Sequence, residues 1–261
     1  MKKLFIILFC IIEFTILYAQ NNLMLQNHVY YSYGGDITWK FISDSLCEIS
    51  EITNSEGYKS KTVGYTYNNK GPYYTLVLKE DNKETEYLAL QGMRNEFILL
   101  YNNPKHSPMY NGFFGRYALN YMGKTVYTTD NYLTEGKIKY IPDNLSNIDI
   151  GKPWVEGSAD SGIGNKIKID NSYVIQSLVI SNGFVSYKVS TYYNNNRVKT
   201  LQVYNSNNRS ENFTVELPDN AIPFEIKIPF NTKNIELEIL DVYKGEKYDD
   251  TCINFILCKN D

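Results

Sequence analysis

Arginine is rare in this chain of 261 residues, and no stretch of the sequence gathers Lys and Arg into a basic stripe. The formal net charge is −3 at pH 7. Proteins hold the phosphate backbone of nucleic acids mainly with clustered Lys and Arg, and a mildly acidic chain does not offer them. We therefore expect no nucleic-acid partner.

Histidine and cysteine are also scarce. The two histidines, His28 and His106, lie far apart, and no His or Cys spacing is typical of a zinc site. Three cysteines, Cys47, Cys252 and Cys258, follow the N-terminal segment, so at least one thiol is unpaired. Cys252 and Cys258 could pair only if the chain turned back between them, and we expect buried, unpaired thiols. No candidate nucleophile or acid–base pair stands out, so we predict no catalytic residues and no metal site.

Long apolar runs are absent except at the N-terminus. Lys2 and Lys3 precede an apolar run from Leu4 to Tyr18, and Ala19 is a suitable cleavage position. The run is shorter than the roughly 20 apolar residues that span a bilayer. We predict that residues 1–20 are a signal peptide, with an uncleaved anchor as the alternative. The exported protein would be secreted or stay in the cell envelope (periplasm or surface), with no membrane span in the mature chain.

Tyrosine and asparagine are abundant, and there are 24 tyrosines, whereas no helix pattern is longer than a turn or two. Tyr, Ile and Val favour strands, and Asn favours turns. The pattern predicts an all-β protein, and its Lys-rich, Arg-poor usage is typical of a bacterial one. The segments expected to be strands are 36–42, 46–53, 63–67, 73–79, 86–91 and 96–101 in the first half, and 166–169, 174–181, 200–204, 212–216, 224–228 and 235–243 in the second.

These strands predict two domains, with a boundary near Gly123. Residues 21–122 are expected to form a small antiparallel β-meander, either a sandwich or a barrel, of unknown role. Residues 124–261 have longer loops between strands, which favours a Greek-key or jelly-roll sandwich. Between them, the loop at 102–115 carries Met109, Tyr110, Phe113 and Phe114. Two interpretations of this loop are open: a lid or contact loop, or side chains packed into the domain's own core.

Polar and aromatic residues gather in three islands of the second half, near residues 154–164, 194–197 and 240–251. Aromatic rings stack on the C–H faces of sugars, while amide, guanidinium and carboxylate groups bond the hydroxyls. The candidate ligand-binding residues are Trp154, Glu156, Tyr187, Tyr192, Asn194, Asn196, Arg197, Tyr243 and Asp250.

Each candidate also has a structural interpretation. Trp154 would close one end of the sandwich, and Glu156 would bond loop amides. Arg197 would pair with Glu156 or Asp250 and fix loop geometry. Asp249 and Asp250 are adjacent, and neighbours on a strand point to opposite faces, so they do not predict the carboxylate pair of a glycosidase.

The order of these motifs resembles the glycan-binding domain of streptococcal NAD glycohydrolase, a discoidin-like jelly roll of the coagulation factor 5/8 type C kind. The resemblance covers about residues 127–257. It is carried by Trp154-Val155-Glu156-Gly157, Gly162-Ile163-Gly164, Ile180-Ser181-Asn182-Gly183-Phe184, Asn195-Asn196-Arg197-Val198-Lys199, Asp241-Val242-Tyr243-Lys244-Gly245 and Tyr248-Asp249-Asp250-Thr251-Cys252-Ile253. It implies a jelly roll that binds glycan. It does not reach a catalytic domain, so NAD hydrolysis is not implied.

One departure from that family bears on metal binding. The family usually has a Ser-Glu-Ile step where this chain has Asn254-Phe255-Ile256. In related sugar-binding jelly rolls this glutamate helps to hold a structural calcium, and Phe255 has no oxygen to offer. We expect no cofactor, and the alternative is a calcium ion held by Asp143, Asp149 and backbone carbonyls.

Together these features predict an exported, non-catalytic, lectin-like protein. The rim loops of its C-terminal jelly roll would bind a glycan or a host or cell-surface glycoconjugate. The main alternative is a protein–protein adhesion or scaffold module at the bacterial cell envelope, with a protein partner. An enzyme site in the first half has only His28, His106, Cys47 and scattered acids to build on. In a further alternative the jelly-roll loops have lost binding and only pack against the first domain.

Overall fold

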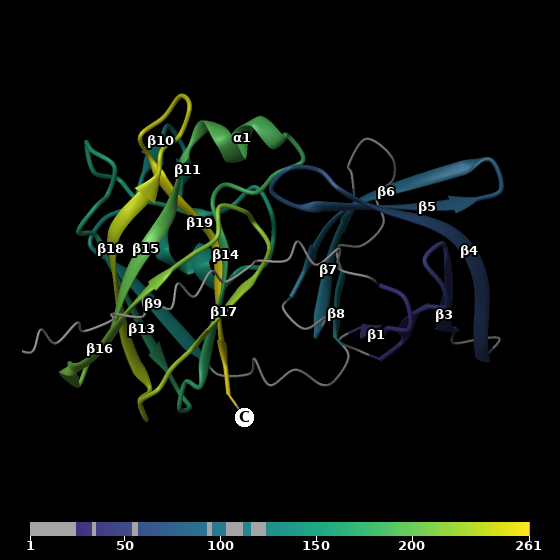
Figure 1. Ribbon diagram of the computed structural model, residues 1–261, viewed down its shortest axis with the longest axis horizontal. Coiled ribbons are helices and arrows are strands. Elements are labelled where there is room, and N and C mark those ends of the chain that lie inside the picture. The colour runs from purple at the N-terminus through teal and green to yellow at the C-terminus, as the bar shows by residue number, and fades with distance from the viewer. Residues whose placement is uncertain are drawn as a thin grey trace, which may run out of the picture.

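A computed structural model describes residues 25–32, 35–53, 57–92, 96–102, 112–115 and 124–260 (Figure 1). Its strands form two bodies side by side, a closed barrel and a jelly-roll sandwich. The prediction of an all-β protein is confirmed. The predicted signal peptide at residues 1–20 lies outside the described residues.

The barrel consists of antiparallel strands that follow one another in chain order. They are β1 (Val29–Ser32), β2 (Ile37–Phe41), β3 (Leu46–Thr53), β4 (Gly57–Asn69), β5 (Tyr74–Glu80), β6 (Lys83–Gln91), β7 (Phe97–Asn102) and β8 (Gly112–Gly115). β8 pairs with β1 and so closes the barrel. Of the two arrangements predicted for the first half, the structure shows the barrel.

Aromatic side chains fill the barrel. The ring of Phe41 meets the rings of Tyr65 and Tyr30 edge to face, with centroids 5.0 and 6.0 Å apart, and all three are buried. Buried Gln91 donates a hydrogen bond to the Tyr30 hydroxyl at 2.9 Å and accepts one from the Tyr67 hydroxyl at 3.1 Å. A barrel of about eight strands is just wide enough for side chains. These rings therefore make its interior a packed core.

The second body begins with β9 (Thr125–Thr129), β10 (Thr134–Glu135), β11 (Ile138–Lys139), a 3₁₀ helix (η2, Pro142–Ser146) and β12 (Trp154–Val155). It continues with β13 (Lys166–Asn171), β14 (Ser177–Asn182), α1 (Val189–Asn194), β15 (Asn196–Asn205), β16 (Asn208–Glu216), β17 (Phe224–Lys227), β18 (Asn234–Tyr243) and β19 (Thr251–Lys259). One sheet has the order β9-β13-β18-β15-β16, and the other has β17-β14-β19-β12. A short parallel contact between β15 and β19 joins the sheets at one end.

Apolar side chains from the inner faces of both sheets form the jelly-roll core, because alternate residues of a strand point to the same side. Burying each large aliphatic chain contributes about 1.5–3 kcal/mol before the entropic cost of folding. The core includes Ile167, Ile169, Leu178, Ile180, Leu201, Val203, Leu237, Ile239, Ile253 and Ile256.

Strand β19 contains an irregularity that affects which of its side chains pack on each face of the sheet. Its pairing with β14 shifts at Asn254, which acts as the extra residue of a β-bulge. As a result Ile253 and Ile256 both reach the jelly-roll core, while Phe255 packs in a different cluster on the opposite face. That face meets the barrel.

The contact between the two bodies is apolar and buried, and we call it the interdomain cluster. Its buried members are Tyr73, Leu88, Leu90, Phe97, Leu99 and Tyr101 from the barrel side, and Val179, Val185, Tyr192, Ala221 and Phe255 from the jelly roll. Hydrogen bonds frame it: the Tyr73 hydroxyl donates to the Ser186 carbonyl at 2.9 Å, and the Ala221 amide donates to the Pro72 carbonyl at 2.8 Å. Lys259 and Glu96 form an ion pair at 2.8 Å.

The three described cysteines are free and buried, as predicted. Burial raises the pKa of the Cys47 thiol to about 12 and that of Cys258 to about 11, and it also raises the pKa of Cys252. Thiols of this kind stay protonated at neutral pH and are poor nucleophiles. They belong to the cores.

Other predictions meet the structure only in part. Met109 and Tyr110 lie outside the described residues, as do the side chains of Phe113 and Phe114, so the role of this loop stays a prediction. The domain limits 21–122 and 124–261 also stay predictions.

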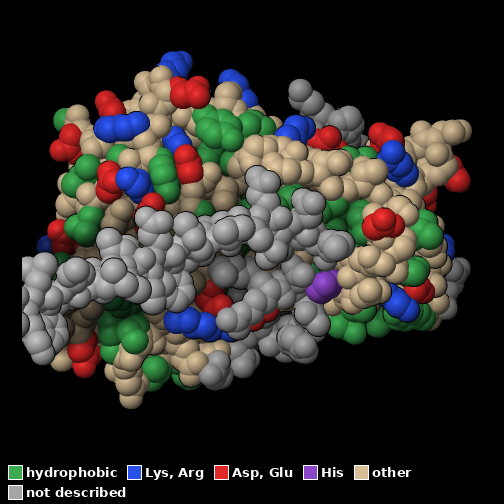
Figure 2. Space-filling view, in the orientation of Figure 1, with side chains coloured by type: hydrophobic (Ala, Val, Ile, Leu, Met, Phe, Trp, Pro, Cys, Tyr) green, Lys and Arg blue, Asp and Glu red, His purple; other side chains and the backbone are tan. Residues whose placement is uncertain are grey.

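Within the described ranges, no helix has the length and apolar character needed to cross a membrane. On the described part of the face in Figure 2, basic and acidic side chains are interspersed.

Candidate functional site: a pocket at the rim of the jelly roll

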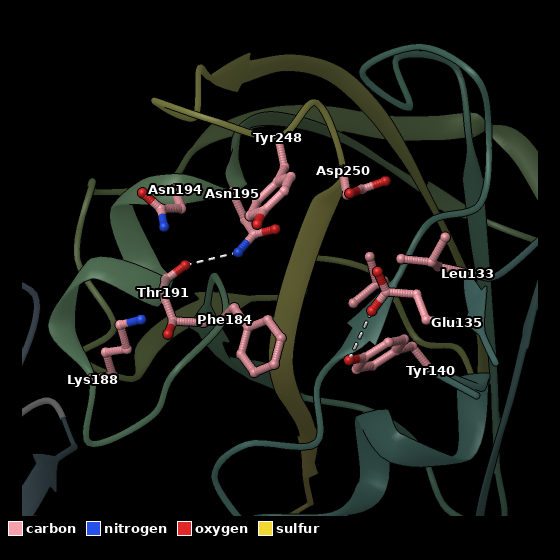
Figure 3. A pocket seen from close by; sticks show the side chains of 11 residues that line it. Leu133, Glu135, Tyr140, Phe184, Lys188, Thr191, Asn194, Asn195, Tyr248 and Asp250 are labelled. Atoms are coloured by element: carbon pink, nitrogen blue, oxygen red, sulfur yellow. Dashed lines mark hydrogen bonds between the residues drawn. The ribbon is translucent and has the colours of Figure 1, made fainter. Parts of the chain in front are cut away.

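A pocket with a volume of about 220 Å³ opens where several jelly-roll loops meet (Figure 3). We call it the rim pocket. Leu133 and Glu135 enter it from the start of the β10–β11 hairpin, and Tyr140 follows that hairpin. The turn after β14, the helix α1 and the loop between β18 and β19 complete the wall. Short, irregular segments at the end of a rigid sandwich are a common place for binding residues.

Three aromatic rings line the rim pocket. Tyr140 and Phe184 pack edge to face, with ring centroids 6.0 Å apart and planes at 70°. Tyr140 is buried and Phe184 is half-buried. Tyr248 lies across from Tyr140 in Figure 3 and is 43% exposed, so its ring is accessible at the mouth. The rings give the pocket apolar surface at its base and its edge.

Amide and hydroxyl groups from α1 provide the polar part of one wall. The Asn195 side chain donates to the Thr191 carbonyl at 2.8 Å, which fixes its orientation (Figure 3). The carbonyl of Asn194 accepts hydrogen bonds from the amides of Lys247 and Tyr248, at 3.1 and 2.8 Å. α1 and the β18–β19 loop are thus held together, which positions Asn194 and Tyr248 in one pocket.

Carboxylates occupy the opposite wall. Glu135 accepts a hydrogen bond from the Tyr140 hydroxyl at 3.3 Å, and Asp250 lies nearby (Figure 3). Burial raises the pKa of the Asp250 carboxyl, and the charges of Glu135 and Asp249 raise it further. Burial and the charge of Glu135 likewise raise the pKa of Tyr140. The ionised form of Asp250 is therefore disfavoured by its surroundings.

We expect Asp250→Asn to raise the melting temperature at neutral pH by about 1–3 °C, a small gain because solvent screens this half-exposed group. The folded-state pKa is raised, so the carboxylate opposes folding above its ordinary pKa of 3.8, and below that value the acid is neutral in both states. The gain should shrink as the pH falls toward 3.8. Thermal denaturation of both proteins across this range measures it. A lower melting temperature for the variant at neutral pH would show that the carboxylate stabilises the loop.

Two of the residues predicted to bind a ligand, Asn194 and Asp250, line the rim pocket. Trp154 does not line it: its side chain is fully buried in the jelly-roll core, and its indole N–H donates to the Asn131 carbonyl at 3.4 Å. Glu156 is also fully buried, and accepts hydrogen bonds from the amides of Ser158 at 2.6 Å and Thr251 at 3.4 Å. These placements match the structural interpretation of both residues.

Arg197 connects three loops behind the pocket. Its guanidinium donates to both carboxylate oxygens of Asp219, at 3.0 and 2.7 Å. It also donates to the carbonyls of Asn195 and Lys244, each at 3.0 Å. The side chain is 6% exposed. The prediction that Arg197 pairs with Glu156 or Asp250 is corrected here, because its acidic partner is Asp219.

The remaining candidates also hold the framework. Asn196 is buried, donates to the Asp249 carbonyl at 2.5 Å and accepts from the Gly245 amide at 2.7 Å. The Tyr243 hydroxyl donates to the Leu217 carbonyl at 2.9 Å. Tyr187, whose hydroxyl donates to the Asn102 carbonyl, and buried Tyr192 both belong to the interdomain cluster. Direct contact of these four residues with a ligand stays a prediction. Their hydrogen bonds and packing within the protein do not favour it.

Sequence reasoning did not select several residues of the rim pocket, notably Tyr140, Phe184, Lys188, Thr191 and Tyr248. Tyr248 lies two positions before Asp250. A tyrosine in a polar loop is a signal that could have predicted a binding residue here. Phe184 lies in a motif that carried the family resemblance, but nothing in the linear pattern shows that its ring meets the ring of Tyr140.

The chain matches the model of a protein family described as the NAD glycohydrolase translocation F5/8 type C domain, over residues 117–259. The chain belongs to this family. The predicted resemblance over residues 127–257 is thereby confirmed, and the jelly-roll strands from β9 to β19 lie inside the matched region. A search of curated proteins found no match.

Solved structures similar to this family member include the CBM32-1 and CBM32-2 domains of ZmpB from Clostridium perfringens in complex with GalNAc. That match has 12% identity and a TM-score of 0.38, and covers 53% of this chain and 33% of that one. The family 32 carbohydrate-binding module of EndoD from Streptococcus pneumoniae matches with 13% identity, a TM-score of 0.41 and coverage of 53% and 97%. The mycobacterial arabinofuranosyltransferase AftD matches with 14% identity, a TM-score of 0.37 and coverage of 53% and 11%. The chain therefore spans a third or less of two of these proteins.

The alternative of a structural calcium ion would depend on Asp143, Asp149 and backbone carbonyls. Phe255 is fully buried in the interdomain cluster, and Asp149 lies 3.8 Å from Lys152. Among the described residues, no group of three or more His, Cys, Asp or Glu side chains is placed to hold a metal ion. Calcium prefers six to eight oxygens, so backbone carbonyls would have to add to those of Asp143 and Asp149, and the alternative of a calcium ion stays a prediction.

Proposed function

We propose that this protein is an exported, non-catalytic carbohydrate-binding protein, and that the rim pocket binds one sugar ring at the end of a glycan. The observation that supports it is the pairing of aromatic surface with amide and carboxylate groups in one small cavity. Sugars present both C–H faces and hydroxyls, and need both kinds of contact. The family resemblance implies the same class of ligand.

The size and shape of the rim pocket support a single ring. Its volume of about 220 Å³ is below the range of roughly 300–1,000 Å³ typical of pockets for drug-sized ligands. Tyr248 supplies a ring face at the mouth, while Asn194 supplies a donor and an acceptor beside it. A terminal sugar can enter, and the rest of the glycan would remain outside.

The proposal that the site does no covalent chemistry is supported by its side chains. The described thiols are buried with raised pKa values, and none of them lines the pocket. Asp249 is exposed and pairs with Lys244 at 3.3 Å, so it does not join Asp250 as a catalytic partner. Glu135 is exposed on a short strand, whereas carboxylates that cleave glycosidic bonds must be held in near-attack geometry.

We infer that the protein acts outside the cytoplasm, in the cell envelope or after secretion, on a glycan or a cell-surface glycoconjugate. The N-terminal sequence pattern of residues 1–20 supports export. The alternative is a protein–protein adhesion module that uses the same loops. In that case free sugars would fail to compete for the partner.

Tyr248→Ala is expected to weaken binding of a glycan identified on an array by about 2- to 13-fold, because an aromatic contact of roughly 0.5–1.5 kcal/mol is lost. Tyr173→Ala is the matched control, since Tyr173 is also exposed, at 57%, but precedes β14 at the other end of that strand. Titration calorimetry of both variants measures the effect. Equal affinities for the two variants would place the site elsewhere, and the absence of any glycan hit would favour the adhesion alternative. Release of free sugar during incubation would contradict the non-catalytic proposal.

A further inference from the structure

The carboxylates at the rim pocket outnumber the cations that could neutralise them. Glu135 and Asp250 line the wall, and Glu156 lies behind it, close enough for the Asp250 charge to act on its carboxyl. Among the described residues, none of these three acids forms an ion pair with Lys, Arg or His. The wall therefore carries negative charge without an internal counter-ion.

The nearby cations are engaged elsewhere. Arg197 is fully committed to Asp219 and to two carbonyl groups. Lys244 pairs with Asp249 outside the pocket, and the ammonium of Lys247 lies 4.9 Å from the centre of the Tyr248 ring. Lys188 lines the pocket, but in Figure 3 it lies on the side opposite Glu135 and Asp250.

Such a wall distinguishes ligands by charge. Asp250 is half-buried without a cationic partner, and its surroundings already disfavour the ionised form of its carboxyl. A ligand ammonium would form charge-assisted hydrogen bonds, which are roughly twice as strong as neutral ones. A ligand carboxylate in the same place would be repelled.

We propose that the rim pocket selects sugars that carry an unsubstituted amino group, with the ammonium held by Glu135 and Asp250, and that it rejects acidic sugars. This selectivity rests on the carbohydrate-binding function proposed above. The ring stacks against Tyr248, and the hydroxyls far from the amine face Asn194 and Thr191. N-acetylation removes the positive charge and with it the advantage over neutral sugars.

The test is a set of titrations of the purified protein, near neutral pH and at low ionic strength. The probes are galactosamine and glucosamine, their N-acetyl forms, the parent neutral sugars and glucuronic acid. We expect at least one amino sugar to bind about tenfold more tightly than its N-acetyl form, since a charged hydrogen bond replaces a neutral one. Glucuronic acid should bind more weakly than glucose.

Asp250→Asn and Asp249→Asn form a matched pair of variants. They are adjacent and change the net charge equally, but only Asp250 lines the pocket, while the Asp249 side chain is 75% exposed. The preference for the amine should disappear in Asp250→Asn and should persist in Asp249→Asn.

The outcomes separate the two proposals. Equal binding of amino, N-acetyl and neutral sugars would overturn the charge selectivity and leave the carbohydrate site intact. Loss of the preference in both variants would show that overall charge, and not the pocket wall, produces it. Failure of every sugar to bind the wild-type protein would overturn the proposed function itself.

Discussion

Replacing Arg197 with methionine is expected to lower the free energy of unfolding by about 3 kcal/mol, the lower end of the cost of breaking a buried ion pair. The low end applies because Asp219 is 36% exposed and can be solvated after the change. The carbonyls of Asn195 and Lys244 lose a charged donor at the same time. Both carbonyls belong to loops beside the rim pocket, so ligand affinity should fall with stability.

Lys199→Met is the matched control for this variant. Lys199 lies on the same strand, β15, and pairs with Asp241 at 2.7 Å, but the two side chains are 38% and 47% exposed. Solvent screens exposed pairs, so this one contributes little to stability. Chemical denaturation of the three proteins gives the comparison. If Arg197→Met unfolds at the same denaturant concentration as Lys199→Met, the guanidinium does not stabilise the loops.

Truncating Phe255 to alanine should cost about 3–5 kcal/mol, the usual range for a large aromatic side chain in a core. Phe255 is fully buried in the interdomain cluster, so the loss falls on the contact between barrel and jelly roll. Phe255→Glu should be more damaging, because a carboxylate would replace the ring without a partner. Phe255→Glu would restore the glutamate that the resemblance places at this position.

Denaturation and limited proteolysis together test the role of Phe255. Leu240→Ala is the control, because Leu240 is 41% exposed on β18 and its truncation removes little buried surface. The Phe255 variants should show earlier cleavage between the two bodies. An unchanged cleavage pattern with a stable fold would mean that the bodies stay together without this ring.

The strand pattern was predictable for longer strands in which apolar and polar residues alternate, whereas the short strands β1 and β9 were missed. β3 was predicted to the residue, at 46–53, because its apolar and polar residues alternate. β4 was predicted only at 63–67, since residues 57–62 are exposed on both faces and carry no apolar period. β19 was missed for the opposite reason: it is buried almost throughout, and the bulge at Asn254 interrupts its alternation.

The site was predictable at the level of loops but not of side chains. The islands around residues 194–197 and 240–251 do border the rim pocket, and Asn194 and Asp250 line it. Arg197 belongs to the first of these islands and Trp154 to the island at 154–164, yet both are buried supports. Aromatic and charged residues in a loop serve either purpose, and only the packing of neighbouring segments decides which. The contact of Tyr140 with Phe184 depends on residues 44 positions apart that no local pattern connects.

One side of helix α1 packs on the interdomain cluster, and another side lines the rim pocket. Val189 and Tyr193 pack on the interdomain cluster, while Thr191 and Asn194 line the rim pocket. A pocket built on such a helix cannot swivel relative to the barrel, so it is not a binding head on a flexible tether. When the pocket holds a sugar ring, the barrel is therefore set in one orientation relative to that ring. Each copy that binds the same sugar in this pocket would present the same barrel face away from it.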